Sequence, residues 1–413
     1  MATVKPFKAL RYTELAGDPK TYTCPPYDII SESEKKEYLN NNPYNVIRLE
    51  KPETGEDIYK TASETLNDFL NNNILALDKT EGFYIYEEEF LYKNKKYNLK
   101  GIIGRVHLEE FSKGIVLPHE NTLSAAKEDR FNLMKATNCN FSQVYSLYFD
   151  EGKETLKFAE ENISEKLCEF KDNSGIIHRL YKVENTEKIT EDFKDRKLFI
   201  VDGHHRYETA LRYKDYKKTE GSEYIMMMLV PMESDGLVVL PTHRVVHSLE
   251  NFNANEVLDK CKEYFYIEEI DDFNKANKAL EEKYLNGKIS FVFYYGKKYC
   301  LLTLKNTADL EKVTKTEVKA LRELDVSVLH SLILENILKI DKENLAKQIN
   351  LTYVKAAEDA VDMVKNGADC TFLLNPTKVS QIAEVAKNGA KMPQKSTYFY
   401  PKLITGLVMN KLD

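Results

Sequence analysis

The chain of 413 residues lacks the sequence features that mark several large classes of protein. No apolar run approaches the ~20 residues that a membrane-spanning helix needs. The first residues, Met1 to Lys5, contain no apolar core of a signal peptide, so we expect a cytoplasmic protein. The 6 cysteines are scattered without a C-x-x-C pair, which favours reduced thiols over a zinc site or a disulfide framework.

Two features of nucleotide-binding and nucleic-acid-binding proteins are also missing. The G-x-x-x-x-G-K-[S/T] pattern does not occur, which argues against an ordinary P-loop nucleotide fold. The formal net charge is −7 and no helix carries a basic cluster, which argues against a protein that coats nucleic acid or an anionic membrane. With 42% apolar and 30% charged residues, the chain has the composition of a soluble globular protein of two or three domains.

Periodicity predicts a mixed α/β protein. Ser31 and Glu34 form a capping box for a helix over residues 32–40, and a strand is expected over residues 46–49. Alternating apolar residues over 83–106 predict a hairpin or meander, and residues 153–171 read as a long charged helix. The continuous apolar run over 224–230 is typical of a strand buried on both faces.

The most informative segment is Phe199 to Leu211, where polar residues stand between an apolar run and a helix. Residues 198–201 predict a buried strand and residues 207–213 a helix, so that Asp202 and Gly203 form the turn between them. Gly203 permits a tight bend, and the first amides of a helix attract an anion. The alternative is that Asp202 only caps the helix.

Basic side chains follow directly at the start of that helix. His204, His205 and Arg206 would add hydrogen-bond donors or positive charge beside the first amides. Phosphate is therefore the expected ligand. In the alternative interpretation these three side chains are simply solvated.

Three further segments carry candidate site residues. Glu120 follows a predicted sheet and would act as a general base beside His119, unless it belongs to a plain loop. Thr242, His243 and Arg244 end a predicted strand and would bind a carboxylate or phosphate, unless they form a solvated turn. Lys395, Ser396 and Thr397 would meet a phosphate, unless the segment is a terminal strand anchored by aromatic residues.

Three of these segments, residues 118–120, 202–206 and 393–397, resemble segments of one enzyme family. Asp202 to Arg206 resembles the phosphate-handling motif of the ParB/sulfiredoxin-like fold, and its double histidine is similar to that of the archaeal ADP-dependent free-serine kinases. Pro118-His119-Glu120 resembles the segment with their catalytic glutamate, and residues 393–397 resemble their C-terminal phosphate-binding segment. The whole chain also resembles a broad, largely uncharacterised bacterial family related to ParB.

The resemblance implies an architecture and a set of roles. An α+β (mixed α/β) fold would comprise a ParB/sulfiredoxin-like catalytic domain with an N-terminal extension over residues 1–250. A second α/β domain over residues 251–413 would contribute residues 393–402 to a cleft between the two. The implied catalytic residues are Glu120, as the base for a serine hydroxyl, and Asp202, at the reacting phosphate and as a ligand of Mg²⁺. The implied phosphate ligands of ADP or ATP are Gly203, His204, His205 and Arg206, and the implied substrate contacts are His119, Thr242, His243, Arg244, Lys395, Ser396 and Thr397.

The match to the kinases ends after Thr397. Where those kinases continue with arginine and histidine, this chain has Tyr398 and Phe399. Lys395, Lys402 or Arg244 would then hold the substrate phosphate instead. The first hundred or so residues have no counterpart in the kinases.

Residues and resemblance agree on phosphoryl transfer. The leading hypothesis is a nucleotide-dependent enzyme that interconverts free L-serine and O-phosphoserine with Mg²⁺, its partners being an amino acid and a nucleotide. Its direction, its nucleotide, water as an alternative acceptor and the oligomeric state stay open. The alternative is a ParB-like nucleotide-binding regulatory or DNA-binding protein, which would need a basic helix-turn-helix. A sulfiredoxin-like role would need a cysteine where this chain has His204.

Overall fold

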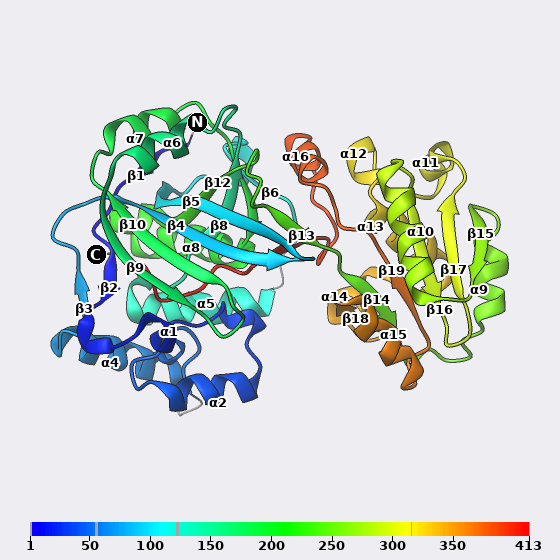
Figure 1. Ribbon diagram of the computed structural model, residues 1–413, viewed down its shortest axis with the longest axis horizontal. Helices are drawn as coiled ribbons and strands as arrows, with labels where there is room; N and C mark the ends of the chain where they lie inside the picture. Colours follow the sequence, from blue (N-terminus) through cyan, green and yellow to red (C-terminus); the bar gives the residue numbers. More distant parts are fainter. Residues whose placement is uncertain (1, 54–56, 121–123, 315, 413) are drawn as a thin grey trace. The chain divides into compact units, whose positions relative to one another are not determined.

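The computed structural model describes residues 2–53, 57–120, 124–314 and 316–412 (Figure 1). The chain folds into two compact units. Unit 1 comprises Met1–Pro118, Thr122–Val238 and Pro401–Asp413, and unit 2 comprises His119–Asn121 and Val239–Tyr400. Both contain helices and sheets, so the predicted mixed α/β class is confirmed. The ParB-like arrangement and the division into folding domains at residue 250 stay predictions.

Unit 1 is built on a mixed sheet of nine strands in the order β6-β11-β8-β12-β5-β4-β10-β9, with β1 pairing with β5. The pairs β11/β6 and β12/β8 are parallel, and the other pairs are antiparallel. The strands of this sheet are β1 (Val4–Lys5), β4 (Phe83–Tyr92), β5 (Lys95–His107), β6 (Val116–Pro118), β8 (Val144–Tyr148), β9 (Ile163–Lys171), β10 (Ile177–Val183), β11 (Leu198–Asp202) and β12 (Tyr224–Pro231).

The other elements of unit 1 are short strand pairs and helices. The pairs are β2 (Leu10–Tyr12) with β3 (Leu75–Leu77), and β7 (Cys139–Asn140) with β21 (Asn410–Lys411). The helices are α1 (Pro19–Tyr22), α2 (Glu32–Asn41), α3 (Ile47–Glu50), α4 (Ile58–Asn71), α5 (Ser124–Thr137), α6 (Glu154–Glu161), α7 (Glu187–Phe193) and α8 (His204–Lys217). Four 3₁₀ turns accompany them at Glu14–Ala16, Tyr27–Ile29, Phe111–Lys113 and Gly221–Glu223.

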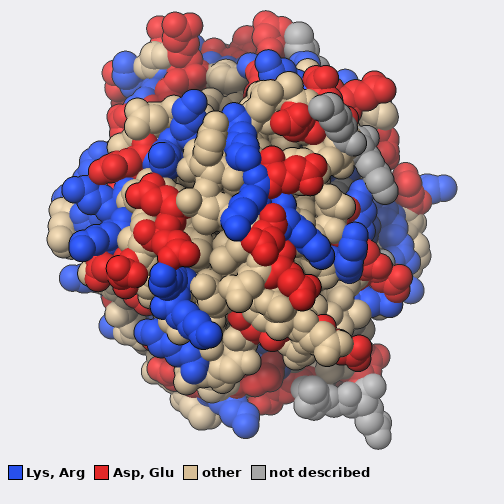
Figure 2. All heavy atoms as spheres, turned by 90° about the vertical axis from the view of Figure 1, so that its right-hand side faces the viewer, with Lys and Arg blue, Asp and Glu red and all other residues tan. Residues whose placement is uncertain are grey.

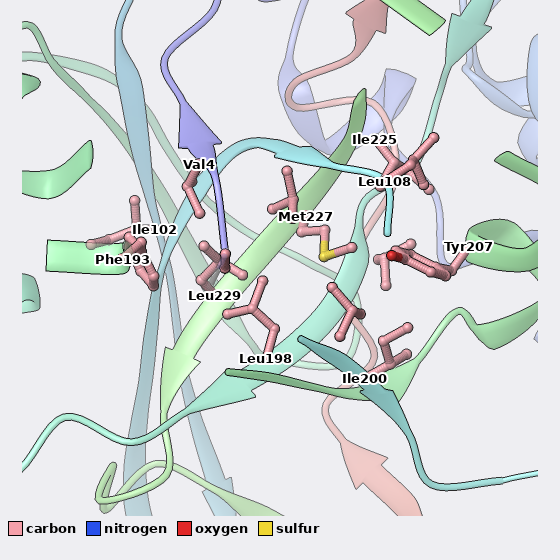
Figure 3. Packing of buried hydrophobic residues seen from close by; sticks show 14 of the residues in the cluster. Val4, Ile102, Leu108, Phe193, Leu198, Ile200, Tyr207, Ile225, Met227 and Leu229 are labelled. Atoms are coloured by element: carbon pink, nitrogen blue, oxygen red, sulfur yellow. The ribbon is translucent and has the colours of Figure 1, made fainter. Parts of the chain in front are cut away.

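Strand β12 lies in the middle of the unit 1 core. All eight of its residues are buried, which confirms the prediction from its continuous apolar run. Because side chains alternate between faces, Met227 and Leu229 point into one cluster together with Leu198 and Ile200 of β11 (Figure 3). Tyr207 of α8 packs into the same cluster, so the start of this helix is fixed against the sheet.

Two sequence predictions in unit 1 are wrong. Residues 46–49 were expected as a strand, but α3 occupies this place because the side-chain oxygen of Asn45 accepts a hydrogen bond from the Ile47 amide at 2.9 Å and starts a helical turn. The helix expected over 153–171 ends at Glu161, and β9 follows. Pairing of β9 with β10 decides its conformation, while the charged side chains of this edge strand remain largely exposed to solvent.

Unit 2 is built on an antiparallel sheet of six strands in the order β15-β17-β16-β19-β14-β18. Helices α10 and α15 pack against this sheet through Ala276, Leu280 and Val361. The strands are β14 (His243–Val246), β15 (Phe265–Ile270), β16 (Ser290–Tyr294), β17 (Tyr299–Leu304), β18 (Leu351–Val354) and β19 (Cys370–Leu373), and a separate pair is formed by β13 (Val238–Leu240) and β20 (Tyr398–Tyr400).

The helices of unit 2 include one irregular case. Helix α13 runs directly into a π-helix, η6, whose apolar side chains are mostly buried. The helical elements are α9 (Ala254–Cys261), α10 (Phe273–Leu285), η5 (Thr307–Asp309), α11 (Leu310–Val313), α12 (Lys319–Arg322), α13 (Asp325–Val328), η6 (Leu329–Ile337), α14 (Lys342–Lys347), α15 (Ala357–Lys365) and α16 (Val379–Lys387). Among the helices that the structure describes in either unit, none has the length and apolar character for a membrane span.

Candidate functional site

The predicted site residues lie in two groups, one in each unit. The Asp202 group of unit 1 consists of Asp202, Gly203, His204, His205 and Arg206, together with Lys402. The Glu120 group of unit 2 consists of His119, Glu120, Thr242, His243, Arg244, Lys395, Ser396 and Thr397.

The Asp202 group is shaped by the turn from β11 to α8. Gly203 adopts a left-handed conformation with φ of 85°, and a Cβ atom there would lie 2.9 Å from the guanidinium of Arg206. The left-handed conformation favours glycine at this position. Helix α8 (His204–Lys217) includes the helix predicted over 207–213 but begins at His204, so that His204, His205 and Arg206 form its first turn.

The carboxylate of Asp202 binds two cations. Lys402 Nζ donates to Oδ1 at 2.7 Å, and Arg206 Nη2 donates to Oδ2 at 3.2 Å. Arg206 Nη1 also donates to the backbone carbonyl of Gln143. Asp202 therefore serves as the anion of a charge cluster rather than as a simple cap of α8, and Arg206 is paired rather than solvated.

Burial and charge act in opposite directions on Asp202. Burial by itself raises the pKa of its carboxyl group, but the neighbouring charges of Lys402, Arg206 and His204 outweigh this effect and hold the pKa well below the ordinary value. The side chains of Asp202 and Lys402 are 22% and 11% exposed, so the pair is partly shielded from water. Asp202 is ionised at neutral pH.

In the Glu120 group, one carboxylate oxygen collects three hydrogen bonds. Glu120 Oε1 accepts from the Ser396 amide at 3.0 Å, from the Thr397 amide at 3.2 Å and from the Thr397 hydroxyl at 3.1 Å. The Met392 amide donates to the carbonyl of His119 at 2.7 Å, which ties the two segments together along the backbone. The sequence predicts both segments as site residues, and the structure brings them into contact within unit 2.

His119 extends this network from the protein interior. Its side chain is fully buried, and Nε2 lies 2.9 Å from the Thr397 hydroxyl and 3.5 Å from Glu120 Oε1. A hydroxyl that donates to the carboxylate accepts from the imidazole, so His119 would orient the Thr397 hydroxyl toward Glu120. The Glu120 side chain itself is 16% exposed.

The loop before Thr397 is held in place from behind. Lys395 has a φ of 57°, in the left-handed region, and its side chain is exposed. Its backbone carbonyl accepts a hydrogen bond from Arg244 Nη2 at 3.1 Å. The Ser396 hydroxyl donates to the Pro393 carbonyl at 2.5 Å, and the Thr377 hydroxyl donates to the Ser396 carbonyl at 3.1 Å. These bonds fix the direction of the two amides that meet Glu120.

Arg244 is a buried support of this loop. It is 1% exposed, and it donates to the Thr242 carbonyl and to His330 Nε2 in addition to Lys395. Its guanidinium lies 5.1 Å from the centre of the Tyr353 ring. Burial lowers the pKa of Arg244 to about 10, an effect that the nearby Tyr353 and Glu120 partly offset.

His243 and Thr242 also face the interior of unit 2. His243 is 4% exposed, and its Nδ1 accepts a hydrogen bond from the Leu374 amide at 3.1 Å. Burial, with a smaller effect from the charge of Arg244, lowers the pKa of His243 to about 4. The neutral imidazole therefore connects β14 to the end of β19.

A separate cavity of about 570 Å³ lies within unit 2. Its lining includes Tyr284, Lys288, Asp325 and Lys378, and burial raises the pKa of Asp325 to about 7. Thr377 also lines the cavity and connects its wall to the Ser396 carbonyl.

No metal centre made of protein side chains is found in the part of the chain that the structure describes, since no three His, Cys, Asp or Glu residues are suitably grouped there. Mg²⁺ bound together with a nucleotide needs only one or two carboxylates and keeps several water ligands. Both oxygens of Asp202 are bound by Lys402 and Arg206, so Mg²⁺ at this carboxylate would have to displace one of these side chains. On the face drawn in Figure 2, Lys and Arg side chains alternate with Asp and Glu.

Sequence reasoning missed the partners that complete each group. Lys402 was linked to substrate phosphate through the resemblance, but the structure pairs it with Asp202, 200 residues away in the chain. Thr377, His330 and Tyr353 support the Ser396 loop or Arg244, and no sequence motif marks them. Of these, Tyr353 is placed by the pairing of β14 with β18, where it stands opposite Arg244.

Known structures and families provide the remaining comparisons. No curated protein matches the chain. A free serine kinase in complex with AMP is similar over 72% of this chain and 88% of its own, at 16% identity and a TM-score of 0.37. A conserved hypothetical protein from Pyrococcus furiosus is similar over 72% and 92%, at 17% identity and a TM-score of 0.36. SbnI from Staphylococcus aureus is similar over 74% and 86%, at 10% identity and a TM-score of 0.38.

The family comparison covers most of the chain. The model of the family described as "Protein of unknown function (DUF1015)" matches residues 4–327, and the chain belongs to this family.

Proposed function

We propose that the protein transfers a phosphoryl group between a nucleotide and free L-serine, interconverting serine and O-phosphoserine. The observation that carries the proposal is the convergence of the Ser396 and Thr397 donors on the Glu120 carboxylate. A carboxylate suited to act as a general base, beside donors suited to an anion, supports the proposal. Phosphoryl transfer to a hydroxyl needs both.

Glu120 is the proposed base. Three hydrogen bonds to Oε1 fix the orientation of the carboxylate, and the partial exposure of the side chain leaves it within reach of a substrate hydroxyl. As the hydroxyl oxygen attacks phosphorus, its proton would pass to Glu120. His119 acts indirectly, because it holds the Thr397 hydroxyl that holds Glu120.

The Asp202 group is the proposed nucleotide side of the reaction. The turn at Gly203 and the start of α8 suit phosphate oxygens, with His204, His205 and Arg206 as neighbouring donors. Asp202 would supply one carboxylate ligand to Mg²⁺, and that ion would neutralise charge on the transferred phosphoryl group. Lys402 would give up its hydrogen bond to Asp202 when the metal binds there, and its ammonium group would bind a phosphate instead.

The substrate side of the reaction is assigned to unit 2. Lys395, Ser396 and Thr397 supply an exposed ammonium group, two amides and hydroxyls for a phosphate monoester. Thr242, His243 and Arg244 were predicted as substrate contacts. We expect the buried Arg244 to support this loop from the interior instead. The buried Thr242 accepts from Arg244 through its carbonyl, and the buried His243 binds the Leu374 amide.

Chain connectivity supports a common task for the two groups. Glu120 stands two residues after Pro118, the end of β6, and β6 pairs in parallel with β11, which ends at Asp202. At the other end of the chain, Lys402 stands five residues after Thr397.

The proposal is tested by product analysis. The full chain is incubated with Mg²⁺, a panel of nucleotides and either serine or O-phosphoserine, and the amino acid and phosphate products are quantified. We expect nucleotide-dependent interconversion that Glu120→Gln reduces by at least about a hundredfold, whereas the exposed Glu343→Gln leaves it unchanged. Equal turnover by wild type and Glu120→Gln would remove Glu120 from the role of base.

A further inference from the structure

The donors assigned to substrate phosphate are already engaged by a carboxylate of the protein itself. The amides of Ser396 and Thr397 are consecutive, they follow a left-handed residue at Lys395, and both point at Glu120 Oε1. Successive amides in such a conformation form a concave anion site, often called a nest. We call this set of two amides and the Thr397 hydroxyl the 396–397 nest.

We propose that the 396–397 nest is an anion site that Glu120 occupies from within, so that Glu120 and a phosphate monoester exclude one another there. This inference rests on the proposed function and adds the regulation of that site. An amide hydrogen makes one strong hydrogen bond, so the nest cannot serve a carboxylate and a phosphate fully at the same time.

The hydrogen bonds of the rest of the loop hold the two amides of the 396–397 nest in place, so that the nest does not rearrange to bind both anions. Arg244 holds the Lys395 carbonyl, and Thr377 holds the Ser396 carbonyl, so the two amides keep their direction. The Ser396 side chain is turned away, toward the Pro393 carbonyl. The mobile partner in an exchange is therefore the anion, and a phosphate that enters must displace the Glu120 side chain.

Proton transfer gives this exchange a direction. In the forward reaction the serine hydroxyl oxygen forms a bond to phosphorus, the bond from phosphorus to the nucleotide oxygen breaks, and the electron pair leaves with the shortened nucleotide. The hydroxyl proton moves to the Glu120 carboxylate. Glu120 becomes neutral and accepts hydrogen bonds more weakly, at the moment when a new dianionic phosphate monoester forms. In the forward reaction the 396–397 nest would thus exchange the Glu120 carboxylate for the phosphate of the product. In the reverse reaction it would exchange the phosphate of phosphoserine for the Glu120 carboxylate.

The test measures anion binding without nucleotide or turnover. Inorganic phosphate and O-phosphoserine are titrated calorimetrically into wild type, Glu120→Gln, Glu120→Ala and the control Glu343→Gln, which loses the same charge at an exposed site. Exclusion predicts roughly tenfold tighter phosphate binding by both Glu120 variants and no change for the control. Adding Thr397→Val to Glu120→Ala removes the nest hydroxyl and should weaken phosphate binding again by several-fold.

Two results would overturn the inference. One is phosphate binding by Glu120→Gln and Glu120→Ala that is no tighter than binding by wild type. The other is equal binding by Glu120→Ala with and without Thr397→Val, which would locate the phosphate elsewhere. A failure of the proposed function would be seen in a different experiment, because no phosphoserine would be formed or consumed in the product assay. The comparison of phosphate binding would remain valid in that case.

Discussion

The pairing of Asp202 with Lys402 allows a quantitative prediction for Lys402→Met. Removing one partner of a fully buried ion pair costs about 3–5 kcal/mol, and an exposed pair contributes about 0–1 kcal/mol. The side chains here are 22% and 11% exposed, and Arg206 still binds Asp202 Oδ2 after Lys402 is lost. We therefore expect Lys402→Met to reduce the free energy of unfolding by about 2 kcal/mol.

The assay is urea unfolding followed by far-ultraviolet circular dichroism. Wild type, Lys402→Met, Asp202→Asn and the double variant form a thermodynamic cycle, whose coupling energy should be about 1–2 kcal/mol because the two groups are in direct contact. The exposed pair of Lys365 with Asp362, at 2.8 Å, is the comparison, and Lys365→Met should cost at most about 0.5 kcal/mol.

The pH dependence of this difference follows from the lowered pKa of Asp202. The stabilising effect of the pair is fully present above the ordinary aspartate pKa of about 3.9 and decreases as the pH falls below it, because Asp202 of the unfolded chain then binds a proton more readily than Asp202 of the folded chain. Wild type and Lys402→Met should converge in acid. Strict additivity in the cycle, or an unchanged unfolding midpoint for Lys402→Met, would refute the reasoning.

Three other predictions concern the supports of the site. Gly203→Ala should lower the free energy of unfolding by about 1–3 kcal/mol, since the residue has φ of 85° and the added Cβ would lie against Arg206. Thermal unfolding is compared with that of Gly287→Ala, where φ is also positive but no neighbour lies within 4 Å, so that backbone strain is separated from crowding. Arg244→Lys should raise the KM for phosphoserine and lower the unfolding midpoint, because lysine lacks the fork that serves three acceptors; unchanged kinetics would contradict its role as a positioning residue. The pKa of His243, lowered to about 4, should make unit 2 lose roughly 3 kcal/mol as the pH falls from 6.5 to 4, because only the unfolded chain binds the proton readily; His243→Asn should flatten this loss in pH-dependent urea titrations.

Local patterns were sufficient for many elements of the fold. The turn at Gly203, the helix that follows it and the fully buried strand β12 were predicted because glycine, apolar runs and periodicity act over a few residues. The capping box of Ser31 and Glu34 is present as predicted. The errors at residues 46–49 and 153–171 arose where a side-chain cap or pairing with a distant strand outweighed local propensity.

The candidate site shows the same limit. Glu120 and Thr397 were recognised from motifs, and the structure joins them across 277 residues of sequence. Lys402 could not be assigned to Asp202 beforehand, because no periodicity links residues 200 positions apart. The burial of Arg244 could not be predicted from the local sequence either, because it depends on the two strands that pair with β14, namely β18 and β19.

The most direct test of the proposed activity follows the phosphorus atom itself. Nucleotides labelled with ³²P in the terminal phosphate are incubated with the full chain, Mg²⁺ and serine, and the label is separated into nucleotide, phosphoserine and inorganic phosphate. We expect label in O-phosphoserine with wild type and the Glu343→Gln control, and almost none with Glu120→Gln. Absence of labelled phosphoserine with every nucleotide, or label that appears in inorganic phosphate at the same rate with and without serine, would contradict the proposed activity.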